Sequence, residues 1–112
     1  MRVAIYSRVS TPKQSTGAQV IALRRYVRRR PGWRLARVYS DTETGASDRR
    51  PGLLELMADA HRKAFDVVLV TRFDRFARST RQLVNALETF NTLGIEFVST
   101  EQTIDTTTAY GK

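Results

Sequence analysis

The order of apolar segments along the chain is the feature that most limits its fold. Four short apolar runs are typical of buried strands, and the three segments between them carry apolar residues at helical spacing. The expected strands span residues 2–8, 33–40, 66–70 and 95–99. The expected helices span residues 12–30, 51–63 and 80–93. This β-α-β-α-β-α-β order predicts an α/β fold with three α/β/α layers around a mainly parallel sheet of four or five strands, of the flavodoxin-like kind.

Local signals mark both ends of the first helix. Thr11 is the expected N-cap, Pro12 the first helical residue, and Gln14 the partner that completes a capping box. Pro31-Gly32 should end this helix near Arg30, because proline cannot continue a helical hydrogen-bond ladder.

The second and third helices have their own end signals. Pro51 is the expected first residue of the second helix, and Gly94 is the expected C-terminal cap of the third. The predicted apolar faces comprise Leu53, Leu54, Leu56, Met57 and Ala60 in one helix and Leu83, Val84, Leu87 and Phe90 in the other. The residues after the fourth strand show no core pattern.

Charge gives the clearest compositional indication of a partner. The chain of 112 residues has a formal net charge of +8, which predicts binding to a polyanion and most often to nucleic acid. Of the 19 basic residues, 16 are Arg, whose planar fork suits phosphate oxygens, although codon bias also enriches arginine. No signal peptide or long apolar run is present, so we expect a soluble, cytoplasmic, nucleoid-associated protein with no membrane partner.

The sequence has no cysteine for a disulfide and few side chains suited to bind a metal ion. The sequence contains no Cys and one His, His61, which excludes disulfides, thiolate metal sites and a site with several histidines. We expect His61 at an exposed or half-buried helix position. No compact acidic group suggests a metal pair either, so we expect a metal-independent reaction and no cofactor.

Polar residues collect where the first three strands end. In a parallel sheet the loops after the strands meet at one edge, where ligands bind. The first loop carries Arg8, Ser10 and Gln14. The second carries Asp41, Thr44, Arg49 and Arg50, and the third carries Arg72, Asp74, Arg75 and Arg78. The predicted edge therefore combines a hydroxyl, several guanidinium groups and carboxylates.

This set of residues fits phosphoryl transfer. Guanidinium groups can stabilise the charge that develops on phosphate oxygens, and a serine hydroxyl can act as nucleophile. Ser10 could instead be a helix cap, but Thr11 with Gln14 already accounts for the cap. The general base stays open, and Asp74 could accept a proton or orient Arg8.

Another arginine group lies within the first predicted helix. It comprises Arg24, Arg25, Arg28, Arg29 and Arg30. We interpret it as a solvated or DNA-facing helix surface and not as catalytic.

Three motifs together resemble the catalytic domain of the serine recombinases, the resolvase and invertase family. Tyr6-Ser7-Arg8-Val9-Ser10-Thr11 is similar to that family's Y-x-R-V-S-T signature, and Gln14 and Gln19 follow at its spacing. The segment from Asp41 to Leu53 is similar to the family's arginine-bearing mobile loop. Phe73-Asp74-Arg75-Phe76-Ala77-Arg78 is similar to its L-D-R-L-x-R motif, with Phe where Leu is usual.

The resemblance implies a role for each matched residue. Ser10 would be the nucleophile that forms a 5′-phosphoserine bond to DNA and frees a 3′-hydroxyl. The phosphate-stabilising residues would be Arg8, Arg75, Arg78 and one of Arg49 or Arg50, of which Arg50 is the better match. Asp74 would organise these arginines. The supporting residues would be Tyr6, Gln14, Gln19, Asp41, Thr44 and Arg49.

The resemblance also implies parts that lie beyond this chain. We expect residues 1–105 to form the catalytic domain and residues 106–112 to begin a C-terminal connection. Family members continue into a long helix and a DNA-binding domain, so we expect a fragment or a truncated gene product that does not complete recombination. The implied partners are double-stranded DNA and, in the full-length protein, further copies that form a homodimer and a tetramer.

The residues leave two alternatives to a recombinase catalytic domain. A non-catalytic DNA-binding or assembly module could keep the fold, but it would not need Ser10, Arg8, Asp74, Arg75 and Arg78 together. A small phosphate-ester hydrolase would need a way to activate water, and the sequence shows no metal site or well-placed His for that purpose.

Overall fold

A five-stranded sheet with the strand order β2-β1-β3-β4-β5 forms the middle layer of this computed structural model. The structure describes residues 1–9, 16–42, 50–72, 76–77, 79–101 and 104–105. The strands are β1 (Arg2–Val9), β2 (Arg34–Thr42), β3 (Val67–Val70), β4 (Glu96–Ser99) and β5 (Ile104–Asp105). The helices are α1 (Thr16–Arg29), α2 (Pro51–His61) and α4 (Thr80–Leu93). β1 to β4 pair in parallel, and β5 runs antiparallel to β4.

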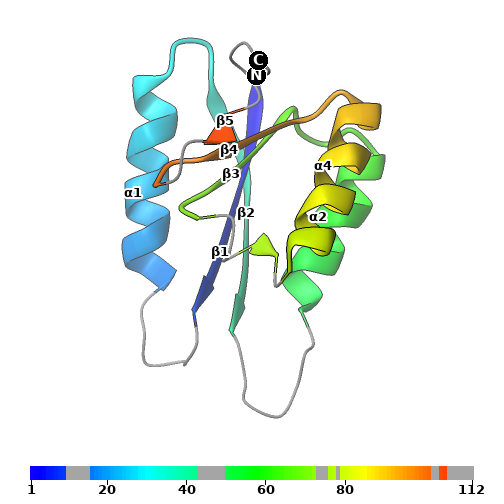
Figure 1. Ribbon diagram of the computed structural model, residues 1–112. Coiled ribbons are helices and arrows are strands. Elements are labelled where there is room, and N and C mark those ends of the chain that lie inside the picture. The colour runs from blue at the N-terminus through cyan, green and yellow to red at the C-terminus, as the bar shows by residue number, and fades with distance from the viewer. Residues whose placement is uncertain (10–15, 43–49, 73–75, 78, 102–103, 106–112) are drawn as a thin grey trace.

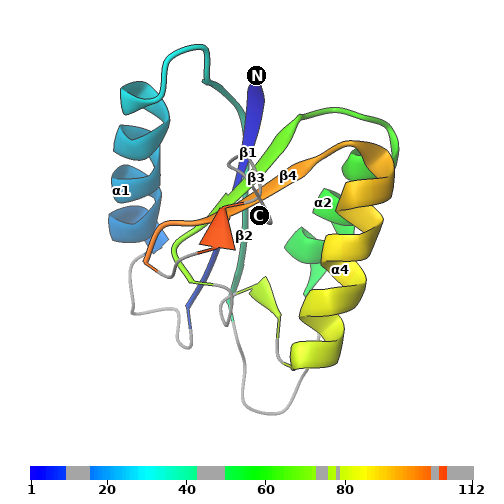
Figure 2. The ribbon, with the colours of Figure 1, turned by 45° about the horizontal axis from the view of Figure 1, so that its top comes forward.

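Helices cover both faces of the sheet, as Figures 1 and 2 show: α1 lies on one face, and α2 and α4 lie on the other. Alternate residues of β1 supply the two cores. Val3 and Ile5 pack with Leu23 and Val27 of α1. On the opposite face, Ala4 and Tyr6 belong to the core that includes residues from α2 and α4. The α/β/α layers and the mainly parallel sheet are therefore confirmed.

A β-bulge explains the irregular alternation of β2. The pairing register with β1 shifts between Val3 and Ala4, which pair with Leu35 and Arg37, so Ala36 is the extra residue. The shift keeps Val38 on the α1 side with Leu35 and sends Tyr39 to the opposite core. Arg37, Tyr39 and Asp41 consequently lie on the sheet face that α2 covers.

Several predicted helix ends are confirmed. α1 ends at Arg29, α2 begins at Pro51, and Gly94 caps α4 in the left-handed conformation at φ 74°. The predicted N-terminal cap of α1, at Thr11, Pro12 and Gln14, lies outside the described residues. Ser79 caps α4, because its side chain accepts a hydrogen bond from the backbone N–H of Gln82.

Other sequence-based expectations were wrong. Asp41 belongs to β2 and not to the following loop, because it continues the parallel pairing with β1, opposite Arg8. Leu54 and Val84 were expected on apolar faces but are 71% and 46% exposed. Helical spacing places Leu54 and Val84 beside core residues, but it does not determine which side of each predicted apolar face packs against the sheet. The short strand β5 was missed, since two residues carry no periodic signal.

None of the helices in the described ranges has a stretch long and apolar enough to cross a bilayer.

Candidate active site

The end of β1 and the start of α2 bring together the described candidate residues. Tyr6 and Arg8 are two residues apart on β1 and therefore share the sheet face covered by α2. Arg8 is paired in register with Asp41 of β2, and both are buried, at 8% and 5% exposure. Sequence positions far apart thus meet at the carboxyl ends of two neighbouring parallel strands, as predicted.

Asp41 caps α2 from the neighbouring strand. Its Oδ1 accepts a hydrogen bond from the backbone N–H of Gly52 at 2.7 Å, and its Oδ2 accepts one from the N–H of Leu53 at 2.9 Å. These N–H groups belong to the first turn of α2, whose N–H groups have no acceptor within the helix itself. A carboxylate there also complements the positive end of the helix dipole. The N-terminus of α2 is therefore already occupied by a protein anion.

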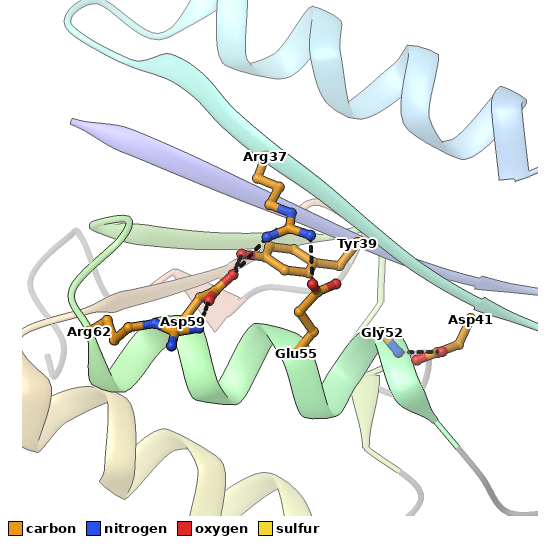
Figure 3. A network of polar contacts seen from close by, with 7 residues as sticks. All are labelled: Arg37, Tyr39, Asp41, Gly52, Glu55, Asp59 and Arg62. Carbon is orange, nitrogen blue, oxygen red and sulfur yellow. Dashed lines mark hydrogen bonds and ion pairs between the residues drawn. The ribbon is translucent and has the colours of Figure 1, made fainter.

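The cap requires glycine at position 52. A β-carbon on Gly52 would lie 2.5 Å from the backbone oxygen of Ser40 and 3.0 Å from Oδ1 of Asp41. Backbone oxygen cannot move aside as a flexible side chain can. Gly52 is thus a close-approach position that allows α2 to begin directly against β2, as Figure 3 shows for its hydrogen bond to Asp41.

Tyr6 links this cap to Arg50. Its hydroxyl donates to Oδ2 of Asp41 at 2.7 Å and accepts a hydrogen bond from Nη2 of Arg50 at 3.1 Å. Burial of the ring, and then its hydrogen bond to Asp41, raise the pKa of Tyr6 well above its ordinary value. Tyr6 therefore stays protonated and acts as a fixed donor and acceptor between a carboxylate and a guanidinium.

Arg50 is fixed from several sides. Besides bonding to the Tyr6 hydroxyl, its Nη2 donates to the backbone oxygen of Phe76, and its guanidinium carbon lies 5.6 Å from the centre of the Tyr6 ring. Phe76 follows β3 and packs edge-on against Tyr6. Arg50 therefore connects the segment after β3 to the ends of β1 and β2, where Arg8 and Asp41 lie.

Among the described residues, the charges at this edge favour an anion. Arg8 and Arg50 bring two guanidinium groups to the face where Asp41 supplies one carboxylate. That carboxylate already accepts hydrogen bonds from Gly52, Leu53 and the Tyr6 hydroxyl. All of these are structural contacts that hold α2 and β1 against β2. Phosphate binding by guanidinium groups is the chemistry that these residues can support.

Gln19 reaches the same strand end from α1. Its Nε2 donates to the backbone oxygen of Arg8 at 3.3 Å. This contact fixes the start of α1 relative to the end of β1. The supporting role that the resemblance implies for Gln19 stays a prediction.

A second polar cluster holds α2 against β2. Asp59 of α2 accepts hydrogen bonds from the Tyr39 hydroxyl at 2.6 Å and from Nη1 of Arg37 at 3.0 Å, both from β2. Arg62 donates to its other oxygen at 2.6 Å, and Arg37 also pairs with Glu55 at 2.7 Å. Figure 3 shows that this cluster and the Asp41 cap engage opposite ends of the same helix. Together they fix the residue that precedes α2, Arg50.

Hydrogen bonds from Arg62 and then Tyr39 hold the pKa of Asp59 below its ordinary value. Burial raises the pKa of Tyr39, and its bond to Asp59 adds to the rise. The cluster is therefore an ionised carboxylate surrounded by donors, and its chemistry is structural.

The remaining predicted site residues are placed as follows. Arg72 is exposed directly after β3. Ser10, Gln14, Thr44, Arg49, Asp74, Arg75 and Arg78 lie outside the described residues. His61 is exposed on α2, as expected, with Nδ1 2.9 Å from the backbone oxygen of Met57. Within the described ranges, no three His, Asp or Glu side chains gather closely enough to hold a metal ion.

Sequence reasoning missed the residues that hold α2 against β2. Gly52 was read only as part of a family motif, although a glycine inside a predicted helix, where it is unfavourable, was a usable sign of close packing. Asp59 and Tyr39 were not singled out. Asp59 is an acidic residue on the predicted apolar face of that helix, beside Met57 and Ala60, and this position could have indicated the cluster.

Comparisons with known proteins agree with this geometry. The family model for the resolvase N-terminal domain matches residues 3–112. The Tn917 resolvase of Enterococcus faecalis is 34% identical over 107 residues, which are 96% of this chain and 53% of that protein. A probable DNA-invertase of Sinorhizobium fredii is 36% identical over 110 residues, 98% of this chain and 33% of that protein. The chain thus spans about half or less of these relatives.

Two solved structures share the fold over most of their own length. The N-terminal catalytic domain of TP901-1 integrase has a TM-score of 0.86 and 38% identity, covering 99% of this chain and 85% of that one. The C-terminal catalytic domain of ISC1926 TnpA, an IS607-like serine recombinase, has a TM-score of 0.79 and 30% identity. The match covers 91% of this chain and 71% of that one.

Proposed function

The chain belongs to the resolvase family of serine recombinases, and from that membership we propose that Ser10 attacks a DNA phosphodiester. The Ser10 Oγ forms a bond to phosphorus, and the bond from phosphorus to the 3′ oxygen breaks. The products are a 5′-phosphoserine bond and a free 3′-hydroxyl. The serine proton passes to a base, for which Asp74 is the candidate, and the leaving 3′ oxygen takes up a proton. Reversal after strand exchange rejoins the DNA.

Guanidinium groups stabilise the phosphate in this proposal. Arg8, Arg50, Arg75 and Arg78 surround the negative charge that grows on the non-bridging oxygens, without a metal ion. Asp74 organises them, and the supporting residues are Tyr6, Gln14, Gln19, Asp41 and Thr44. The observation that carries the proposal is the position of Arg50. It is fixed by Tyr6 and Phe76 at the strand edge that also holds Arg8.

Of the two adjacent arginines, we assign the phosphate-stabilising role to Arg50 and not to Arg49. Arg50 immediately precedes α2, whose start is fixed by the Asp41 cap. Its guanidinium is already directed to the end of β1 through the Tyr6 hydroxyl. A guanidinium held in advance loses less freedom when the phosphate binds, which is the property that electrostatic catalysis needs.

Double-stranded DNA is the proposed substrate, and the excess positive charge supports that choice. Residues 1–105 are the proposed catalytic domain, and residues 106–112 lead toward a C-terminal connection. The full-length protein is proposed to act as a homodimer and tetramer in the cytoplasm, associated with the nucleoid. Chelating agents are expected to leave cleavage unchanged.

A fusion protein tests the proposal. The chain replaces the matching part of Tn917 resolvase, which then supplies the remaining C-terminal half and the recognition of its own recombination site. Supercoiled plasmid carrying that site is incubated with the fusion, the reaction is stopped with denaturant, and protein covalently held on 5′ DNA ends is measured. Tn917 resolvase itself is the positive control.

The two competing functions give different results in this assay. The recombinase proposal predicts an adduct that the Ser10→Ala fusion does not form. Site binding without any adduct from the unsubstituted fusion would favour the non-catalytic DNA-binding or assembly module.

A further inference from the structure

The outward face of α1 carries four arginines that the proposed reaction does not use. Arg24, Arg25, Arg28 and Arg29 are all exposed, and they occupy the last two turns of the helix. The opposite side of the helix carries Leu23 and Val27, which are buried against the sheet. The four guanidinium groups therefore project away from the protein core; we call them the α1 arginine surface.

This surface has no internal partner in the part of the chain that the structure describes. None of its four arginine side chains takes part in a hydrogen bond or ion pair there. α1 itself contains no acidic residue, as its sequence TGAQVIALRRYVRR shows. Arginines on this surface thus differ from Arg37 and Arg62, whose charges are used to hold Asp59.

The arrangement does not serve the stability of the helix. Arg24 and Arg28 are four residues apart, as are Arg25 and Arg29, and like charges at this spacing destabilise a helix. The helix dipole favours cations in the last turn, which accounts for Arg28 and Arg29. It does not account for Arg24 and Arg25, which lie one turn earlier. The unfavourable repulsion would be relieved by an external anion.

Two further arginines extend the positive charge past the end of α1. The guanidinium carbon of Arg30 lies 4.2 Å from the centre of the Trp33 ring, and its Nη1 donates to the Tyr26 hydroxyl at 3.1 Å. Arg34 follows at the start of β2 and is exposed. This end of α1 is therefore rigid, since an aromatic pair and a cation hold the turn that follows it.

The α1 arginine surface lies far from the candidate active site. α1 starts near the carboxyl end of β1, through Gln19, and runs back toward the beginnings of β1 and β2. Its last turn is tied to that opposite edge, where the N–H of Arg34 donates to the backbone oxygen of Met1. Figures 1 and 2 show α1 alone on its face of the sheet, with no neighbouring helix over its outer side.

We propose that the α1 arginine surface binds the phosphate backbone of duplex DNA at a place separate from the strand-cleavage site. Arginine forks suit phosphate oxygens, and backbone contacts of this kind position a protein on DNA without reading its sequence. A membrane surface fits less well. The outward side of α1 carries one large apolar residue, Ile21, and lacks the apolar face of an interfacial helix. The choice of DNA among polyanions rests on the proposed function.

The test compares two variants that have the same net charge. In one variant, Arg24, Arg25, Arg28 and Arg29 are changed to Gln, a good helix former. In the matched control, four exposed residues elsewhere, Ala58, Asn85, Asn91 and Thr92, are changed to Glu. Each variant lowers the formal net charge from +8 to +4. The dissociation constant for a short fluorescent duplex is measured from low to physiological salt, after circular dichroism has confirmed folding.

The proposal predicts that the salt dependence of binding becomes weaker in the fourfold Gln variant and not in the Glu control. Each lost phosphate contact should reduce the slope of log affinity against log salt by about 0.9, so a reduction of about 2–4 is expected. The Glu control should bind more weakly but with its slope unchanged. Two double variants, Arg24→Gln with Arg28→Gln and Arg25→Gln with Arg29→Gln, should each show about half of this reduction in slope. They serve as the test if the fourfold variant fails to fold.

Three results would overturn the inference: equal slopes for the Gln variant and the Glu control, no duplex binding by the unsubstituted chain at low salt, or binding to anionic lipid vesicles but not to DNA. Reversible binding does not require Ser10. A failed adduct assay with an intact slope difference would therefore contradict the proposed reaction and leave this surface supported.

Discussion

The Tyr6 hydroxyl donates a 2.7 Å hydrogen bond to Oδ2 of Asp41, across two neighbouring strands. The same carboxylate caps α2, and the same hydroxyl accepts a hydrogen bond from Arg50, the residue before that helix. One buried contact therefore connects the sheet edge, the helix start and a candidate phosphate-binding guanidinium. A change to either partner should affect both stability and the proposed cleavage.

Tyr6→Phe tests the hydroxyl alone. The ring keeps its edge-on contact with Phe76, whose centre lies 5.9 Å away, while Asp41 loses a donor and Arg50 loses an acceptor. The free energy of unfolding should fall by about 1–2 kcal/mol, as for a lost buried hydrogen bond. Urea unfolding measures that loss, and the rate of adduct formation by the fusion should fall as well. An unchanged rate would show that Tyr6 does not position Arg50 for the reaction.

Gly52→Ala tests the close approach of α2 to β2. The new methyl group would meet the Ser40 backbone oxygen at 2.5 Å, so the helix start must shift. We expect a loss of about 1–3 kcal/mol, the usual range for overpacking. Ala58→Ser adds one atom at an exposed position of the same helix and should change the free energy of unfolding by less than about 0.5 kcal/mol. Equal effects in the two variants would remove the steric argument.

Acid should weaken the fold through Asp59 and Asp66. Donors from Arg62 and Tyr39 hold the pKa of Asp59 below its ordinary value, and hydrogen bonds from Arg2 do the same for Asp66. A carboxyl whose pKa is lower in the folded state binds protons less readily there than in the unfolded chain. Its stabilising contribution is complete above the unfolded pKa of about 4 and is lost as the pH falls through the lowered folded value.

The measurement is urea unfolding from neutral pH into the acid range. The free energy of unfolding should decrease below about pH 4. Asp59→Asn should make that decrease shallower, because one of the two carboxyls no longer titrates. Ala58→Ser, at an exposed position of the same helix and without a titratable group, is the control and should leave the pH profile unchanged. A profile identical in Asp59→Asn and the unsubstituted protein would contradict the assignment.

The two adjacent arginines can be separated by substitution. Arg50→Gln should reduce adduct formation by about 10²-fold or more, the scale for loss of one transition-state donor. Arg49→Gln removes the same charge from the neighbouring residue and should change the rate far less. Circular dichroism checks that Arg50→Gln keeps its helices, since Arg50 also bonds to the backbone oxygen of Phe76. The reverse order of effects would transfer the role to Arg49.

The sequence predicted the layers of the fold because burial determines its pattern. The strand Val67–Val70 is buried on both faces and reads as an unbroken apolar run, and Gly94 marks the end of α4 by its positive φ. The bulge at Ala36 could not be read from alternation alone, since it changes the face of every later residue in β2.

The candidate site was predictable in part. Its placement at the strand ends follows from parallel topology, and the structure brings Tyr6, Arg8, Asp41 and Arg50 together there. The role of Asp41 was not predictable. Whether a carboxylate accepts a proton or caps a helix depends on which N–H groups lie within 3 Å of it, and that is a property of tertiary packing.

Formation of the covalent DNA adduct tests the central claim most directly. The fusion with Tn917 resolvase is mixed with its supercoiled site plasmid and stopped with denaturant, and the residue attached to the 5′ phosphate is identified by digestion and mass spectrometry. The account predicts a 5′-phosphodiester bond to Ser10, present with chelator and absent in Ser10→Ala. An adduct that persists in Ser10→Ala, or one attached to another residue, would contradict it.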